Sequence, residues 1–436
     1  MSDVLAGKID RRDAHLGGLG LTRLEHAYGF FAPVVFGAIQ AISPIWGASF
    51  EELQSRRGLV PRIGDASIWL HGASAGEMSA AQNLSALLHD SGYRFSSIYT
   101  STNRAGLEFI RRSHTNSAIS TWVPWDTARA LDRAFDRWKP KAIFLVETEL
   151  WPRMVFEAYR RDIPIFLVSG RIYPQDVSRY RLIKPFIGPT LNRLTMILAQ
   201  DEQERSRFLR LGAPAEVCFA AGNLKYLNQK RTSPLSLVPP LNLRKNDRLV
   251  VAGSLHDDEI VPVLDALHRL ERGIRILVAP RHASGVEIAL RHARVLGRNV
   301  ARRSDPLQSE WEILVLDTMG ELAQVYALAT CAIVGGGFGR HGGHNLFEPV
   351  VAGAPVLFGQ HFGNFAAEAR LLAGATPTAQ LASIGNLHDI LLQILSSEGR
   401  RLSFLSLQSK AIPDKETTAK SYLNLLGPRL DEIEYA

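Results

Sequence analysis

The chain has 436 residues, of which 46% are hydrophobic and 21% are charged. This balance is typical of a folded globular protein, and the length favours two domains over one. The formal net charge of +7 favours acidic partners such as anionic lipid or phosphorylated substrates. Few aromatic residues lie among the short, scattered basic clusters, so we expect no nucleic-acid groove.

The two cysteines, Cys218 and Cys331, lie in apolar segments typical of buried strands. We therefore expect free thiols in a reducing compartment. The cysteines and histidines do not have the spacing of metal ligands, and the sequence contains no Asp-x-Asp motif. The sequence thus predicts neither a metal site nor a disulfide framework.

The segment Ala27–Phe50 contains no Asp, Glu, Lys, Arg or His. Its length could span a bilayer, but Pro33 and Pro44 interrupt it. Acidic residues precede it, which disfavours a cleaved signal peptide. We predict that residues 1–50 form a leader and a membrane-associated segment that lies in the interface. A full span is the second interpretation, and a helical hairpin packed on the protein itself is the third.

From residue 51 onward, strand-like and helix-like segments alternate. Continuous apolar runs between helical patterns indicate parallel sheets covered on both faces. The predicted strands of the first series are Ser67–Leu70, Phe95–Thr100, Thr121–Val123, Ala142–Val146, Ile163–Val168 and Met196–Ala199. Those of the second series are Leu249–Ala252, Ile274–Ala279, Ile313–Leu316, Ala332–Val334 and Val356–Phe358.

A proline-containing segment at residues 233–246 separates the two series and is typical of an interdomain linker. We predict an α/β protein with two doubly wound domains, residues 51–232 and 247–400, and a helical tail at 401–436. Ligands of such sheets bind outside the carboxyl ends of the strands, so we expect the site in a cleft between the domains.

The turn HGASAGE at residues 71–77 follows the first predicted strand and has three interpretations. Gly72, Ser74 and Gly76 match the nucleophile elbow of serine hydrolases, although that fold needs earlier strands. Glu77, in the first helical turn, could instead act as general base toward a sugar hydroxyl. In the third, Ser74 only caps the helix and Glu77 only complements its dipole.

Other charged residues also follow predicted strands. Glu147 and Glu149 come directly after Ala142–Val146, and since they face opposite sides locally, we expect only one to line the site. Arg171 and Lys225 follow later strand-like segments and could bind a carboxylate or phosphate.

The glycine-rich run GGGFGRHGGHNLFEP at residues 335–349 follows a predicted strand and leads into a helix. Dense glycine lets backbone approach a ligand closely. Pro349 fits a first helical turn, whose free N–H groups favour phosphate. Asn345 and Glu348 could reach sugar hydroxyls. The run therefore predicts a nucleotide site.

Taken together, these motifs resemble the 3-deoxy-D-manno-octulosonic acid (Kdo) transferases of lipopolysaccharide synthesis, in order from about Ile68 to Leu372. The motifs are HGASAGE at 71–77, ETELWP at 147–152, GNLK at 222–225, PRH at 280–282, MGE at 319–321 and GGHNLFEP at 342–349. The resemblance implies a GT-B glycosyltransferase fold of two Rossmann-like domains with an N-terminal membrane anchor.

The resemblance further implies an inverting enzyme that moves Kdo from CMP-Kdo to a lipid A precursor (lipid IVA) without cofactor or metal. Its place would be the cytoplasmic face of the inner membrane, against anionic lipid. It assigns the general base to Glu77 and transition-state stabilisation to Glu147 and Lys225. The residues that it assigns to CMP are Pro280, Arg281, Met319, Gly320, Glu321, Asn345, Leu346, Phe347 and Glu348.

The chain departs from the family pattern at Ser169 and Gly170, where Asn-Ala is usual, at Leu255 and at Gly337. Three alternative functions compete with the transferase. They are a serine hydrolase using Ser74, a nucleotide-sugar epimerase on the same two-domain scaffold, and a non-catalytic protein that binds a membrane surface.

Overall fold

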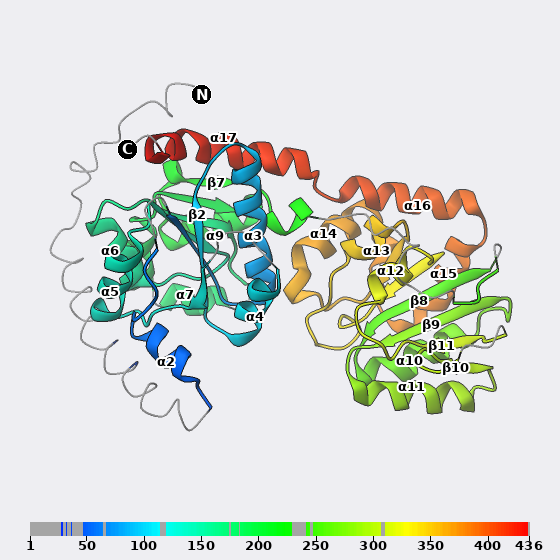
Figure 1. Ribbon diagram of the computed structural model, residues 1–436. Helices are drawn as coiled ribbons and strands as arrows, with labels where there is room; N and C mark the ends of the chain where they lie inside the picture. Colours follow the sequence, from blue (N-terminus) through cyan, green and yellow to red (C-terminus); the bar gives the residue numbers. More distant parts are fainter. Residues whose placement is uncertain are drawn as a thin grey trace. The chain divides into compact units, whose positions relative to one another are not determined.

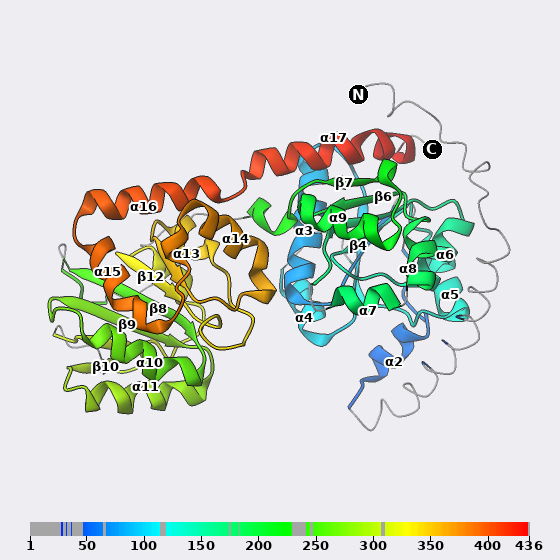
Figure 2. The ribbon, with the colours of Figure 1, turned by 180° about the vertical axis from the view of Figure 1, so that it is seen from behind.

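The computed structural model describes residues 47–63, 67–113, 119–173, 176–182, 184–228, 241–244, 247–306 and 310–434, with Tyr28, Ala32 and Phe36. It has two compact units, Met1–Asn228 with Lys415–Ala436, and Gln229–Asp414 (Figures 1 and 2). Most of the predicted leader and of the linker 233–246 lies outside the described residues. Among those described, none of the helices combines the length and apolar sequence needed to cross a membrane.

The first unit contains a seven-stranded parallel sheet in the order β3-β2-β1-β4-β5-β6-β7. Its strands are β1 (Ser67–Gly72), β2 (Ser96–Ser101), β3 (Ile119–Trp122), β4 (Ala142–Val146), β5 (Ile165–Gly170), β6 (Met196–Ala199) and β7 (Cys218–Ala220). Its helices are α2 (Phe50–Arg56), α3 (Ala75–Asp90), α4 (Arg104–Arg112), α5 (Ala128–Trp138), α6 (Pro152–Arg160), α7 (Val177–Leu182), α8 (Lys184–Leu191), α9 (Glu202–Leu211) and α17 (Lys415–Glu434), with a 3₁₀ helix η3 (Leu224–Asn228). The order reverses between β1 and β4, where doubly wound sheets bind their ligands.

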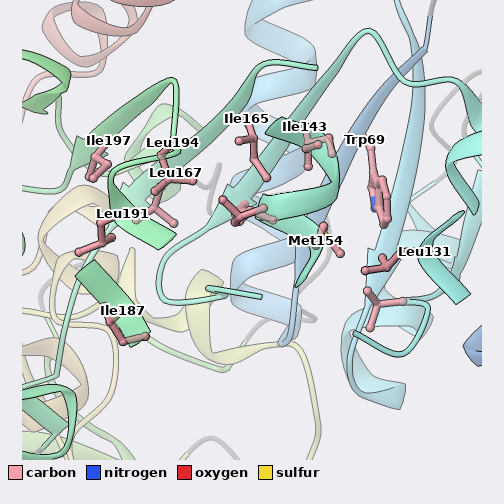
Figure 3. Close-up of a cluster of buried hydrophobic side chains, with 14 of the residues drawn as sticks. Trp69, Leu131, Ile143, Met154, Ile165, Leu167, Ile187, Leu191, Leu194 and Ile197 are labelled. Carbon is pink, nitrogen blue, oxygen red and sulfur yellow. The ribbon is translucent and has the colours of Figure 1, made fainter. Parts of the chain in front are cut away.

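Both faces of this sheet are buried, as the continuous apolar runs predict. In β4, Ile143 and Leu145 belong to one core cluster, while Phe144 and Val146 belong to the other. Figure 3 shows part of the first cluster, in which Trp69 of β1 and Met154 of α6 lie near the β4 side chains. Two packed layers of helices therefore hold the strand ends of the sheet in fixed positions.

The second unit contains a six-stranded parallel sheet in the order β10-β11-β9-β8-β12-β13. Its strands are β8 (Arg248–Leu255), β9 (Ile274–Pro280), β10 (Val300–Arg302), β11 (Ile313–Val315), β12 (Cys331–Val334) and β13 (Val356–Phe358). Its helices are α10 (Asp257–His268), α11 (Ala283–Val295), α12 (Leu322–Tyr326), α13 (Phe347–Ala352), α14 (Ala366–Ala375), α15 (Leu387–Leu395) and α16 (Glu398–Ala411). The order reverses between β8 and β12. The two free thiols, Cys218 and Cys331, are buried.

The residues expected to form one helical tail, 401–436, divide between the two units. Helix α16 belongs to the second unit, where the buried Gln408 side chain bonds to the N–H and C=O of Val356, both at 2.8 Å. Helix α17 belongs to the first unit. Pro413 lies between them, and proline cannot continue a helix. The predicted tail is thus helical, and its two helices belong to different units.

Three described residues of the predicted membrane-associated segment pack on the first unit. Tyr28, Ala32 and Phe36 are helical and four residues apart, so they share one helix face. The Tyr28 hydroxyl donates to Asp126 Oδ2 at 2.6 Å, and the Phe36 ring stacks on Trp125 with centroids 5.0 Å apart. On this face, the contacts agree with the interpretation that the segment packs on the protein.

Asp126 connects this segment to α6. Its fully buried carboxylate also accepts hydrogen bonds from the backbone N–H of Arg153 at 3.0 Å and of Met154 at 2.8 Å. Burial raises the pKa of Asp126 to about 6, although these hydrogen bonds and the one from Tyr28 lower it. The helix N-terminus is thus capped by a carboxylate that titrates close to neutral pH.

This raised pKa predicts a pH-dependent contribution to stability. The pKa of Asp126 in the folded protein lies above the value of about 3.9 in an unfolded chain. The contribution of Asp126 to the free energy of unfolding is therefore fully present below the unfolded pKa and is lost as the pH rises through about 6. We expect the free energy of unfolding of the wild type to rise relative to that of Asp126→Asn by about 1 kcal/mol between about pH 7 and pH 5, as part of a full effect of about 3 kcal/mol that is reached at lower pH. Thermal unfolding of both proteins across this range measures it, and a constant difference would contradict it.

Candidate functional site

The first candidate site lies at the carboxyl ends of the neighbouring strands β1 and β4. Ser74 caps α3 by accepting a hydrogen bond from the Glu77 N–H at 3.2 Å, which places Glu77 in the first helical turn. A Cβ on Gly72 would lie only 2.8 Å from the Glu77 Cβ. Glycine is therefore required here for the end of the strand to pack against the start of the helix.

The Glu77 carboxylate is half-buried and hydrogen-bonded within its own turn. Oε2 accepts from the Ala73 N–H at 2.5 Å, and Oε1 accepts from the Ser74 hydroxyl at 3.1 Å. Burial raises the pKa of Glu77, and the charges of Glu147 and Glu149 raise it further against the lowering effect of these hydrogen bonds. A carboxylate of this kind is a better proton acceptor than an ordinary glutamate.

Glu147 is a buried carboxylate held between two cations. It forms ion pairs with Lys225 Nζ and with Arg171 Nε, the latter at 3.2 Å. A Cβ on Gly76 would lie 3.3 Å from Lys225 Nζ, so the ammonium group passes close to the first turn of α3. Arg171 and Lys225, which could bind a carboxylate or phosphate, are thus both paired with a carboxylate of the protein.

Glu149 points to other partners. Its Oε2 lies 3.1 Å from His71 Nε2 and accepts hydrogen bonds from the Thr102 hydroxyl at 3.2 Å and the Trp151 indole at 3.0 Å. Burial acts to raise the pKa of Glu149, but these partners outweigh it and lower the pKa. The two carboxylates after β4 thus face different partners, as expected, yet both charges act on Glu77.

The environment of Ser74 disfavours the hydrolase interpretation. Its hydroxyl is occupied by Glu77, and its backbone is extended, with φ −109° and ψ 166°. The nearest motif histidine, His71, places Nδ1 2.9 Å from the Thr100 hydroxyl and Nε2 beside Glu149. Within the described residues, Ser74 therefore has no imidazole that could take its proton.

In the second unit, the glycine-rich run follows β12 at the point where the strand order reverses. The carboxylate of Glu259, from α10, is buried and accepts four backbone hydrogen bonds. The donors are the N–H groups of His256 at 3.0 Å, Gly336 at 2.7 Å, Phe338 at 2.9 Å and Gly339 at 3.0 Å. Three N–H groups of the loop therefore bind an internal carboxylate.

The glycines of the run also serve internal packing. A Cβ on Gly337 or Gly343 would lie 1.8 Å or 2.2 Å from the ring of Phe362. A Cβ on Gly342, which has φ +85°, would lie 2.4 Å from the Asn364 amide. At these positions the absence of a Cβ makes room for side chains of the protein itself.

Of the predicted sugar-binding residues, Glu348 is the more available. The Asn345 side-chain oxygen accepts from the N–H groups of Phe347 at 3.0 Å and Glu348 at 3.3 Å and so caps α13. The side chains of Leu346 and Phe347 are fully buried, which leaves only their backbone for a ligand. Burial raises the pKa of Glu348, and no described residue forms a hydrogen bond or ion pair with its carboxylate.

The remaining predicted nucleotide residues lie at the same edge of the sheet, because β9, β11 and β12 are parallel. Pro280 ends β9 and is followed by the exposed Arg281. After β11, Met319 is 92% exposed and Gly320 has φ +87°. The Glu321 carboxylate accepts from Arg303 Nε at 2.9 Å.

Sequence reasoning missed a histidine cluster at this edge. His256 stacks on His341 with centroids 3.9 Å apart, and its Nε2 lies 3.1 Å from His344 Nε2. His282 lies 5.4 Å from His256, centroid to centroid. Burial lowers the pKa of His344 to about 4, helped by the charge of Arg281. The histidines lie in separate motifs, so only the β8, β9 and β12 pairing could have grouped them.

The part of the chain that the structure describes holds no group of His, Cys, Asp and Glu side chains placed to bind a metal. The first unit offers a carboxylate with a raised pKa and a second carboxylate that is paired with two cations. The second unit offers histidines, an arginine and an unpaired carboxylate.

Comparison with known proteins decides the family. A family model described as 3-deoxy-D-manno-octulosonic-acid transferase matches residues 51–228. The 3-deoxy-D-manno-octulosonic acid transferase of Bordetella pertussis is 30% identical over 349 residues, which cover 77% of this chain and 81% of that protein. The chain belongs to the Kdo transferase family. The transferase of Haemophilus influenzae is 28% identical over 375 residues, covering 84% of this chain and 87% of that protein.

The fold comparison agrees with a GT-B enzyme. A crystal structure of UDP-N-acetylglucosamine 2-epimerase matches with a TM-score of 0.58 and 14% identity, covering 84% of this chain and 96% of that one. Identity this low shows a shared fold and not a shared activity. The sequence relatives are transferases, so the chain is a glycosyltransferase, and the hydrolase, epimerase and non-catalytic alternatives are not favoured.

The Glu259 contacts predict a large effect on stability. Glu259→Ala leaves four backbone N–H groups without their acceptor, and we expect it to lower the free energy of unfolding by about 3–5 kcal/mol. The control is Glu271→Ala, an exposed ion-pair residue of the same unit, for which we expect a change within about 0.5 kcal/mol. Urea denaturation measures both, and equal effects would contradict the role of Glu259.

Proposed function

We propose that this Kdo transferase moves Kdo from CMP-Kdo to a hydroxyl of a lipid A precursor in a single inverting displacement. The observation that carries the proposal is the Glu77 carboxylate, whose pKa is raised by burial and by two neighbouring carboxylates. A general base works best when its pKa approaches the working pH. Glu77 would take the proton of the acceptor hydroxyl as that oxygen attacks the anomeric carbon.

Glu147 and Lys225 would stabilise the transition state. The Lys225 ammonium has three N–H donors, and its ion pair with Glu147 leaves donors for an anionic substrate such as the Kdo carboxylate. The buried negative charge of Glu147 is in turn placed to stabilise positive charge that develops at the anomeric carbon. Arg171 holds the second oxygen of Glu147 and so fixes its orientation.

The second unit would bind CMP-Kdo. The exposed Arg281 and the histidines beside it are suited to the phosphate. The unpaired Glu348 carboxylate is suited to the ribose hydroxyls, beside Asn345 and the backbone of Leu346 and Phe347. Pro280, Met319, Gly320 and Glu321 would complete the nucleotide site. We expect no metal or other cofactor, since cationic side chains would neutralise the leaving phosphate.

We further propose that the enzyme works at the cytoplasmic face of the inner membrane through the segment Ala27–Phe50. The net charge of +7 would attract it to an anionic leaflet and to a phosphorylated acceptor. Tyr28 and Phe36 contact the first unit, and the uncharged sequence around them is suited to a membrane interface.

A transfer assay tests this function. Purified protein is incubated with CMP-Kdo and a tetraacylated lipid A precursor, and the lipid product is weighed by mass spectrometry. We expect the lipid to gain mass in units of Kdo. Release of free Kdo with an unchanged lipid would indicate hydrolysis and would contradict the proposal.

Substitution of Glu77 tests its role as the base. Since a general base contributes about 10²–10⁴-fold to rate, we expect Glu77→Gln to lower transfer by at least about 10²-fold. Binding of CMP-Kdo, measured by calorimetry, should be unchanged. The control is Glu108→Gln on the surface of α4, which should transfer at the wild-type rate. Substantial transfer by Glu77→Gln would contradict the assignment.

A further inference from the structure

We propose that Tyr422 of α17 is a positioning residue that holds Lys225 in the active site, an inference that rests on the proposed function. Tyr422 comes near the end of the chain, in the helix drawn in red in Figure 1. Its ring is fully buried in the core cluster that contains Val146 of β4 and Val168 of β5. Glu147 directly follows β4, and Ser169 lies near the end of β5.

The Tyr422 hydroxyl bonds both to Ser169 and to the GNLK segment that carries Lys225. It accepts a hydrogen bond from the Ser169 N–H at 2.9 Å and donates one to the Gly222 carbonyl at 3.1 Å. Burial raises the pKa of Tyr422 to about 12, so the hydroxyl keeps the proton that it donates at neutral pH. One side chain thus links the end of β5 to the beginning of the GNLK segment.

Ser169 also bonds to the segment that carries Lys225. Its side-chain oxygen accepts a hydrogen bond from the N–H of Leu224, the residue before Lys225, at 2.8 Å. At Gly222, which has φ +99°, an added Cβ would lie 3.0 Å from Thr418 of α17. The segment that carries Lys225 is therefore held between the end of β5 and the C-terminal helix.

The backbone at this point needs such support. Ser169 has φ +49° and Glu147 has φ +60°, a region that residues other than glycine seldom occupy. The two residues follow paired positions of neighbouring strands, and the Glu147 N–H donates to the Val168 carbonyl at 3.0 Å. Strained backbone persists only where its surroundings hold it, and Tyr422 supplies the acceptor for the Ser169 N–H.

Removing the Tyr422 hydroxyl should therefore loosen Lys225 and leave the charge of Glu147 less compensated. That charge raises the pKa of Glu77, so the pKa should rise further. For Tyr422→Phe we expect kcat to fall about tenfold and the acid limb of its pH profile to move to higher pH. The KM for CMP-Kdo should change less than kcat does, because the residues proposed to bind CMP lie in the other unit.

The control is Leu430→Ala, which removes a fully buried side chain from the same helix and has no hydrogen bond to Ser169. It should lower the melting temperature at least as much as Tyr422→Phe and leave the acid limb in place. An equal shift of the acid limb of the pH profile in Leu430→Ala would overturn the proposal, since general loosening of the helix would then explain the shift in both variants. Wild-type kcat and pH profile in Tyr422→Phe would overturn it as well.

Hydrogen exchange tests the contact without any assay of transfer. The amides of Ser169 and Leu224 should exchange faster in Tyr422→Phe than in the wild type, and slower or equal exchange would overturn the proposal. Absence of transfer by the wild-type protein would refute the proposed function. The exchange experiment would still decide whether Tyr422 positions the segment.

Discussion

The active site of the first unit depends on one buried carboxylate, Glu147. It is held in a left-handed backbone conformation at the end of β4 and is neutralised by Lys225 and Arg171 from two other segments. Its charge is also one of the reasons that the pKa of Glu77 is raised. In the proposed mechanism three functions would meet in this group, since Glu147 pairs with two cations, raises the pKa of the proposed base and would present negative charge to the reacting centre.

The second unit uses a buried carboxylate in a different way. Glu259 binds four backbone N–H groups and so fixes the glycine-rich loop before any substrate arrives. Both carboxylates lie where the strand order of their sheet reverses, the position at which such folds bind ligands. Each unit therefore presents a prearranged surface, and prearrangement lowers the cost of binding and of reaching the transition state.

The sequence predicted the strands well where they form continuous apolar runs. Strands β4 and β6 are buried on both faces, so their apolar runs coincide with the observed strands, Ala142–Val146 and Met196–Ala199. Strand β10 was missed because Val300–Arg302 is a short, half-buried edge strand. The motifs also predicted that Glu77, Glu147 and Lys225 lie near strand ends. In the structure, Lys225 forms an ion pair with Glu147, and the charge of Glu147 raises the pKa of Glu77.

Other features of the site follow from contacts between residues distant in sequence. The glycines at 337 and 343 fit around Phe362, and nothing in the local sequence distinguishes such packing from room for a ligand. The support of Ser169 by Tyr422 likewise joins residues far apart in the chain.

In the proposed mechanism, the charge of Glu147 raises the pKa of Glu77, the proposed base. The most direct test is to titrate the Glu77 carboxyl by infrared difference spectroscopy, subtracting the spectrum of Glu77→Gln, in the wild type and in Glu147→Gln. The account predicts a Glu77 pKa above the ordinary glutamate range in the wild type and a lower value in Glu147→Gln. An ordinary pKa in the wild type, or one that does not fall in the variant, would contradict it.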